Sequence, residues 1–157
     1  MIHTKQKIAD FGEVFTPEKT VNEMLDMLDP KVWGDPGSVF VETSCGEGAF
    51  LTAILRRRVE ALKTSHTLRQ ALSITLNTVC GREIQRKNAQ ACLHRLHSVV
   101  AEYTDDEEFL LYAAAVLQYQ IKCGDGLKFK MGPCFDQLPE DVKKHRIDKI
   151  RTHNQRR

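Results

Sequence analysis

The stretch that decides the fold runs from Ser38 to Leu51 and reads Ser-Val-Phe-Val-Glu-Thr-Ser-Cys-Gly-Glu-Gly-Ala-Phe-Leu. Its apolar run is typical of a buried strand, and an acidic residue, Glu42, stands where that strand should end. Two glycines, Gly46 and Gly48, then permit a tight turn and a close approach of the backbone to a ligand. An amphipathic helix follows, and its free N-terminal amide groups face the same position. The stretch therefore predicts a nucleotide-cofactor turn between a strand and a helix.

The details of this turn argue against a phosphate ligand. A dinucleotide fingerprint has a third glycine for helix–strand packing, and here that position is Leu51. A phosphate-cradling loop has Gly-Lys-Ser/Thr, and neither Lys nor Ser/Thr follows Gly48. The carboxylate of Glu42 would repel a pyrophosphate but suits a ligand with cationic groups, such as an amino-acid ammonium or a sulfonium. The alternative is a strand–turn–helix whose glycines serve geometry alone.

Length and composition indicate one globular domain. The 157 residues are 41% hydrophobic and 28% charged, close to the globular norm, and a net charge of +2 does not by itself argue for nucleic acid. The five cysteines are odd in number and include no Cys-x-x-Cys pair, so neither a zinc site nor a disulfide framework is expected. No apolar run approaches the roughly 20 residues of a spanning helix, and residues 1–10 lack the apolar core of a signal peptide, so a cytoplasmic location is expected.

Apolar periodicity predicts helices and strands on both sides of the turn. One helix should begin at an N-cap, Thr16, and end before Pro30, and another should follow Gly48 to about residue 63. Further strands are expected at residues 77–80 and 120–123, each behind a helical segment. This alternation predicts right-handed βαβ units and a parallel sheet covered on both faces.

Beyond residue 126 the periodic pattern weakens. Residues 129–135 could form a fourth strand, but prolines and a glycine interrupt it, and the basic end of the chain is expected to be solvated or frayed. Three consecutive arginines, residues 56–58, are expected to flank a buried helix stripe as solvated charges, with nucleic-acid binding as the alternative.

An acidic residue stands at the end of each of the three expected strands: Glu42, Glu83 and Asp125. Because ligands of parallel sheets bind outside the carboxyl ends of the strands, these acids should face one site. A carboxylate at the second strand can accept hydrogen bonds from both hydroxyls of a ribose. The alternative for Glu83 is a solvated acid that pairs with Arg82 or Arg86.

Four short segments occur in an order that resembles a known enzyme family. They are Gly12-Glu13-Val14-Phe15-Thr16-Pro17, Glu42-Thr43-Ser44-Cys45-Gly46-Glu47-Gly48, Gly81-Arg82-Glu83-Ile84 and Gly124-Asp125. Together, over residues from about 10 to 127, they resemble the N-terminal half of S-adenosylmethionine-dependent DNA adenine-N6 methyltransferases of restriction–modification systems. The resemblance implies an α/β, Rossmann-like class I methyltransferase fold with a parallel sheet and helices on both faces, which stops after the third or fourth strand. It implies an incomplete S-adenosylmethionine-binding domain over residues 1–140 and a basic tail over residues 141–157.

The resemblance also assigns residues to the methionine end of S-adenosylmethionine. Phe15, Thr16 and Pro17 would line this end of the cofactor, with Thr16 near its carboxylate. Glu42 and the turn from Gly46 to Gly48 would face the amino group and the sulfonium arm.

The nucleoside end falls to the later motifs in the same way. Glu83 would hold the ribose hydroxyls, Ile84 would pack on the adenine, and Asp125 would accept a hydrogen bond from the adenine amino group. The complete set of expected cofactor-binding residues is Phe15, Thr16, Pro17, Glu42, Ser44, Cys45, Gly46, Gly48, Glu83, Ile84 and Asp125.

One segment of the family pattern is missing from this sequence. Family members carry Asn/Asp-Pro-Pro-Tyr/Phe after the fourth strand, where it binds the target amine and stacks on the flipped base. No two prolines are adjacent here, and the nearest echo is Asp136 followed by Pro139. We therefore expect no catalytic residue and no methyl transfer by this chain alone. DNA would be reached through a complementing region, and an open sheet edge would pair with a complementing methyltransferase chain or with a second copy.

Two other functions fit parts of the pattern. A non-catalytic regulatory module could keep this fold and use its basic patches to contact nucleic acid or a partner subunit. A nicotinamide-dependent oxidoreductase would need the missing third glycine and a second catalytic region.

Overall fold

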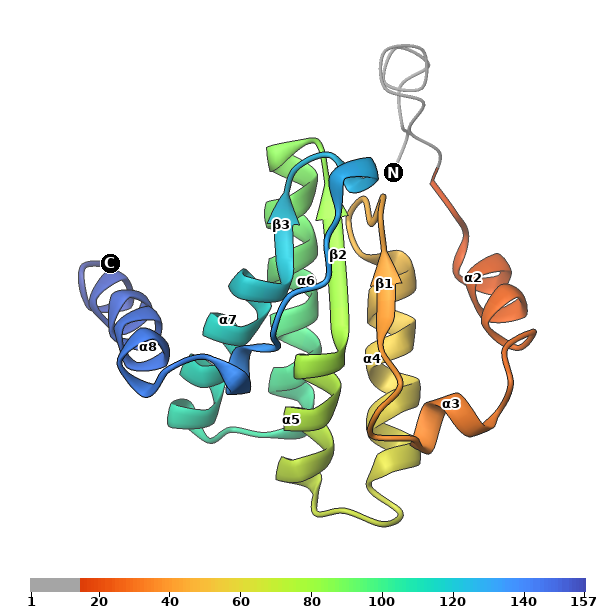
Figure 1. Ribbon diagram of the computed structural model, residues 1–157, viewed down its shortest axis with the longest axis horizontal. Coiled ribbons are helices and arrows are strands. Elements are labelled where there is room, and N and C mark those ends of the chain that lie inside the picture. The colour runs from red at the N-terminus through yellow and green to blue at the C-terminus, as the bar shows by residue number, and fades with distance from the viewer. Residues whose placement is uncertain (1–14) are drawn as a thin grey trace.

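The computed structural model describes residues 15–157, in which helices and strands alternate around a small sheet (Figure 1). The elements in chain order are α2 (Glu18–Leu25), α3 (Lys31–Gly34), β1 (Phe40–Glu42), α4 (Ala49–Leu62), α5 (Leu68–Thr78), β2 (Val79–Glu83), α6 (Arg86–Tyr103), α7 (Glu107–Gln120), β3 (Ile121–Cys123), the 3-10 helices η1 (Gly126–Lys128) and η2 (Phe135–Gln137), and α8 (Glu140–Gln155). The expected segment Gly12–Val14 lies outside the described residues.

The three strands form a parallel sheet in the order β1-β2-β3. Phe40 pairs with Val79 at the start of β1, and Gly81 pairs with both Glu42 and Ile121. The predicted α/β class and the parallel sheet are thereby confirmed. Because all three strands run the same way, their carboxyl ends meet at one edge of the sheet, where the glycine turn also lies.

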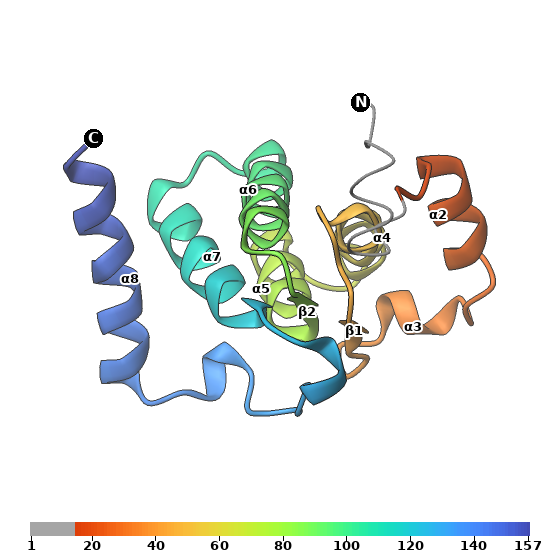
Figure 2. The same ribbon diagram turned by 90° about the horizontal axis from the view of Figure 1, so that it is seen from above.

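The two faces of the sheet are covered differently. Figure 2 shows α4, α6 and α7 on one side of the strands and the segment that follows β3 on the other. On that second side the guanidinium of Arg82 lies 4.7 Å from the ring centroid of Phe129, while Val41 keeps 39% of its surface exposed. Helices α4, α6 and α7 of residues 15–157 therefore lie on one face of the sheet, whereas helices on both faces were expected. When strands are added in one direction, right-handed crossovers place every connecting helix on the same face.

Two helices continue directly into strands. The expected strand at residues 77–80 begins two residues later, because Asn77 and Thr78 still belong to α5. A capping box between Thr67 and Gln70 starts that helix, which satisfies two backbone groups at its N-terminus. In the same way α7 leads into β3 without a loop. Helix α2 begins after Pro17 as N-cap rather than after Thr16.

The core lies between the sheet and α4 to α7. Its fully buried large apolar side chains are Val21, Leu51, Leu55, Leu62, Leu72, Leu76, Leu96, Phe109, Leu117, Ile121 and Phe135. Phe135 does not belong to a fourth strand: it sits in η2, with its ring 5.9 Å from that of Tyr112 and 6.0 Å from that of Tyr119. The basic end, expected to fray, forms α8, which packs on the core through Ile147 and Ile150.

The three consecutive arginines have separate internal partners, which corrects the expectation that all are solvated. Arg58 is fully buried and donates to the carbonyls of Val32, Trp33, Asp35 and Ser38 and to the hydroxyl of Thr78 at 2.6–3.2 Å. Burial lowers the pKa of Arg58.

Its two neighbours in the chain lie nearer the surface. Arg56 makes a two-pronged contact with Glu102, at 2.5 and 3.0 Å, and Arg57 pairs with Asp26 at 2.7 Å. The three arginines therefore stabilise the fold, and Arg58 connects α4 to the segment that precedes β1 through its hydrogen bonds.

Candidate functional site

The turn after β1 has the geometry that its glycines predict. Gly46 and Gly48 have φ values of +53° and +89°, a region that residues with a Cβ rarely adopt. A Cβ on Gly48 would also lie 2.8 Å from the sulfur of Cys92 in α6. The turn therefore packs closely on α6, and Gly48 is the N-cap of α4 without a side-chain cap.

Glu42 ends β1 beside this turn and is half-buried without a cationic partner among residues 15–157. The hydrogen bond of its carboxylate is a long one, 3.4 Å from the amide of Ser44. Burial raises the pKa of Glu42, because the charged form loses hydration that no cation replaces. A carboxylate in this condition favours the arrival of a positively charged group.

A cavity of about 130 Å³ opens over the turn. It is lined by Phe15, Thr16, Glu42, Ser44, Cys45, Gly46, Glu47, Ala49, Phe50 and Arg95. A groove of about 500 Å³ beside α2, α4 and α6 shares Phe15, Thr16, Ala49 and Arg95 with it, so the two spaces adjoin. The structure thus brings together the residues expected at the methionine end of the cofactor, with Pro17 next to them at the start of α2.

Glu83 is directed into the protein rather than into the cavity. Its side chain is 5% exposed, and its two carboxylate oxygens accept from the amides of Gly46 at 2.9 Å and Gln85 at 2.8 Å. Within the described residues it makes no ion pair, so the alternative of a salt bridge with Arg82 or Arg86 is not what the structure has. Glu83 supports the turn by holding the amide of Gly46.

The other residues expected at the nucleoside end also lie outside the cavity. Ile84 is 68% exposed, and Asp125 accepts from the amide of Leu127 at 2.9 Å, which caps η1. A Cβ on Gly126 would overlap the carbonyl of Thr43, so the loop after β3 packs against the loop after β1. None of Glu83, Ile84 and Asp125 is among the residues that line the cavity over the turn.

Cys45 contributes packing rather than a nucleophile. A hydrogen bond with Cys92 and burial both raise its thiol pKa well above the usual range. The thiolate, which is the reactive form, is therefore strongly disfavoured.

Sequence reasoning missed two residues, one at the cavity and one at the adjoining groove. Arg95 lies on α6 and reaches the cavity over the turn, and Thr52, whose buried hydroxyl oxygen has no hydrogen-bond partner among residues 15–157, belongs to the lining of the adjoining groove. Neither belongs to a motif, and only the packing of α6 beside α4 brings Arg95 to the turn.

Asp136 lies at the opposite end of the sheet from this cavity. Its carboxylate accepts from the hydroxyl of Tyr112 at 2.8 Å, and its amide donates to the side chain of Asn77 at 3.0 Å. Asn77 precedes β2, so Asp136 stands at the amino ends of the strands (Figure 1). It is therefore remote from a ligand held at their carboxyl ends.

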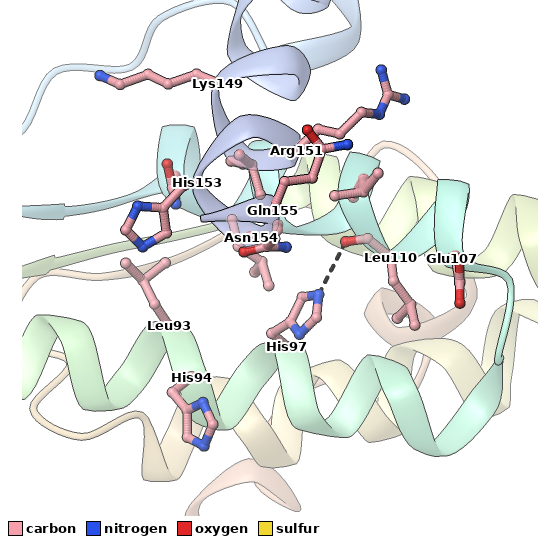
Figure 3. A pocket seen from close by; sticks show the side chains of 15 residues that line it. Leu93, His94, His97, Glu107, Leu110, Lys149, Arg151, His153, Asn154 and Gln155 are labelled. Atoms are coloured by element: carbon pink, nitrogen blue, oxygen red, sulfur yellow. Dashed lines mark hydrogen bonds between the residues drawn. The ribbon is translucent and has the colours of Figure 1, made fainter. Parts of the chain in front are cut away.

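A second cavity, of about 830 Å³, lies away from the turn between α6, α7 and α8 (Figure 3). In it His97 of α6 bonds through Nε2 to the carbonyl of Leu110, and Arg151 of α8 pairs with Glu108 and Asp148. His97 and Arg151 thus have partners within the protein, and none of the residues expected at the cofactor site lines this cavity. We place the candidate site at the smaller cavity because the glycine turn and the half-buried carboxylate of Glu42 are there.

Comparisons with known proteins identify no family. No protein-family model matches the sequence, and neither a curated protein nor a solved structure matches it. In the part of the chain that the structure covers, no group of histidine, cysteine and acidic side chains could hold a metal ion. Among the helices of that same part, none combines the length and the apolarity that crossing a membrane requires.

Proposed function

We propose that this chain is the S-adenosylmethionine-binding portion of a DNA adenine-N6 methyltransferase of the restriction–modification type. The observation that carries the proposal is Glu42, a half-buried carboxylate without a cationic partner within residues 15–157, beside a turn that needs two glycines. S-adenosylmethionine supplies an ammonium and a sulfonium and has no phosphate. It therefore suits an acidic site without a phosphate-binding lysine.

The strand order of the sheet supports the proposal of a Rossmann-like class I fold. One half of a doubly wound sheet has three parallel strands in sequence order with its crossover helices on one face, and β1-β2-β3 has this arrangement. In such sheets the ligand lies at the carboxyl ends of the strands beside the first strand, which is where the cavity opens.

The choice of DNA adenine as acceptor rests on the resemblance of the four ordered motifs. The sequence contains no Pro-Pro segment, so in this proposal the acceptor amine is bound by a region that complements this chain. A cytoplasmic location belongs to the same proposal.

Calorimetric titration with S-adenosylhomocysteine tests cofactor binding, with ATP as the comparison ligand. We expect saturable binding of the former and none of the latter, and a Glu42→Gln variant should bind at least about tenfold more weakly because a charged hydrogen bond is lost. No heat and no shift of the melting temperature with S-adenosylhomocysteine would refute the proposal. Labelled cofactor with DNA rich in candidate sites tests catalysis: methylation by this chain alone would refute the need for a complementing region.

The partner in this proposal docks at the free edge of β1. Among residues 15–157 this strand pairs with β2 alone, and Val39 and Val41 are 46% and 39% exposed, although strands of parallel sheets are normally buried on both faces. A further strand, from a complementing chain or a second copy, would pair with this open backbone edge. Light scattering after gel filtration tests self-association through this edge.

The alternative, a nucleic-acid-binding module without catalysis, loses its main argument. All three arginines of the run at 56–58 are bound within the protein, and Arg151 of the basic end pairs with Glu108 and Asp148. Retention on DNA that weakens with salt and does not depend on the cofactor would favour this alternative.

A further inference from the structure

We infer that Arg95 binds the carboxylate of an α-amino-acid group in the cavity over the glycine turn, while Glu42 binds its ammonium. The inference rests on the proposed function and deepens it, because it assigns to α6 a residue that selects ligands with an amino-acid tail.

Two opposite charges line one small space. Glu42 and Arg95 both border the cavity of about 130 Å³, yet they do not form an ion pair with each other. Within residues 15–157, the side chain of Arg95 makes no hydrogen bond or ion pair, and the carboxylate of Glu42 has no cation. Two uncommitted charges of opposite sign on the wall of one cavity match a zwitterion placed between them.

The other arginines of the groove are already committed. Arg56 is bound to Glu102 and Arg57 to Asp26 and Asn22, so their guanidinium groups are held away from a ligand. Arg95 is thus the guanidinium that remains to bind a ligand among the described residues that line the groove and the cavity.

The polar groups around Arg95 fit a carboxylate as well. Thr16 and Ser44 line the same cavity. Hydroxyl groups and a guanidinium are donors that carboxylate oxygens accept from, and a guanidinium can bind both oxygens at once. At the other end, an ammonium beside Glu42 would replace the hydration that burial removes from this carboxylate.

The size of the cavity limits what it can hold. Pockets for whole drug-sized ligands measure about 300–1,000 Å³, so a space of about 130 Å³ takes one part of a larger ligand. An amino-acid group would occupy it, while the nucleoside would lie outside this cavity. Recognition of the tail and of the nucleoside are therefore separable.

The test compares two ligands that differ in the tail. S-adenosylhomocysteine carries the amino-acid group, and 5′-methylthioadenosine has the same nucleoside without it. By calorimetry, we expect Arg95→Gln to lower the affinity for S-adenosylhomocysteine about 10- to 100-fold and to leave the affinity for 5′-methylthioadenosine unchanged. Arg95→Lys, which keeps the charge, should recover part of the lost affinity.

Arg156→Gln is the matched control, since Arg156 lies at the end of α8 and lines neither the cavity nor the groove. It should bind both ligands as the unaltered protein does. Melting temperatures of all variants should agree, because the side chain of neither arginine makes a hydrogen bond or an ion pair within residues 15–157.

The outcomes separate the two claims. If the unaltered protein binds S-adenosylhomocysteine and Arg95→Gln binds it equally well, the role of Arg95 is refuted while the proposed function stands. If the unaltered protein binds neither ligand, the proposed function is refuted and this inference with it. Equal weakening of both ligands by Arg95→Gln would also overturn the inference, because it would show no selectivity for the tail.

Discussion

Replacing Gly48 with alanine should destabilise the protein through two separable effects. The first is backbone strain: φ is +89°, and a residue with a Cβ in the left-handed region costs about 1–2 kcal/mol. The second is a steric conflict, because the new Cβ would lie 2.8 Å from the sulfur of Cys92, and overpacking of this kind costs about 1–3 kcal/mol. The stiffer unfolded chain offsets about 0.4–1 kcal/mol. The net loss should be about 2–4 kcal/mol.

A second substitution separates these effects. Cys92→Ala removes the sulfur, and the remaining contacts of the new Cβ, 3.5 Å to the Cα and Cβ of residue 92, are ordinary van der Waals distances. Cys92 is fully buried, so Cys92→Ala alone should cost about 1 kcal/mol for the small cavity it leaves. The double variant should then be more stable than the sum of the single losses by about 1–3 kcal/mol, the steric part of the Gly48 effect.

Urea unfolding of the unaltered protein, the two single variants and the double variant measures this double-mutant cycle, and Gly132→Ala is the control. No atom lies within 4 Å of the position that a Cβ on Gly132 would take, and its φ is not positive, so this substitution should change stability by less than about 0.5 kcal/mol. Additive losses in the double variant, within about 0.5 kcal/mol, would refute the close packing of the turn on α6. Gly48→Ala should also lower the affinity for S-adenosylhomocysteine, because the turn that borders the ligand site would shift.

Three further outcomes are expected. Arg58→Met should lower the free energy of unfolding by about 3–5 kcal/mol and the melting temperature by about 6–20 °C, because four backbone carbonyls lose a buried hydrogen-bond donor. Arg56→Met removes an exposed ion pair and should cost far less, so equal losses in the two variants would contradict the role of Arg58. The folded-state pKa of Glu42 lies above its ordinary value of 4.5, so protonation of Glu42 stabilises the fold at low pH, and this stabilisation is lost as pH rises through the folded-state pKa. In urea unfolding, Glu42→Gln should therefore be more stable than the unaltered protein at pH 7, and the difference should vanish near pH 3. A variant that is less stable than the unaltered protein at pH 7 would contradict the raised pKa. If copies associate through β1, Val41→Lys should shift light-scattering masses to the monomer, and an unaltered protein that is monomeric at every concentration would exclude self-association.

The local structure of this protein was largely predictable from sequence. The alternation of apolar runs and the glycine turn predicted three parallel strands and the helices after the turn, because periodicity and glycine conformation are local properties. Boundaries were less predictable: Asn77 and Thr78 were expected in a strand but are helical, because a capping box at Thr67 and the packing of α5 extend the helix to the first residue of β2.

The candidate site divides in the same way. The glycines and Glu42 followed from a local strand–turn–helix pattern, and the structure places them at one cavity. The direction of the Glu83 side chain did not follow, because it depends on the amide of Gly46, 37 residues away in the chain. The place of Asp125 likewise depends on how the loop after β3 meets Thr43.

What the sequence by itself determined is the kind of turn and the charge beside it: Gly46 and Gly48 permit positive φ, and Glu42 disfavours a phosphate ligand. Only the tertiary structure decided that Arg58 is buried, and that Arg95 comes to the wall of the Glu42 cavity. The physical reason is that charge and backbone freedom belong to a residue. Whether a side chain is buried, and which groups it contacts, depends on how α4 and α6 pack, and no local sequence pattern specifies that packing.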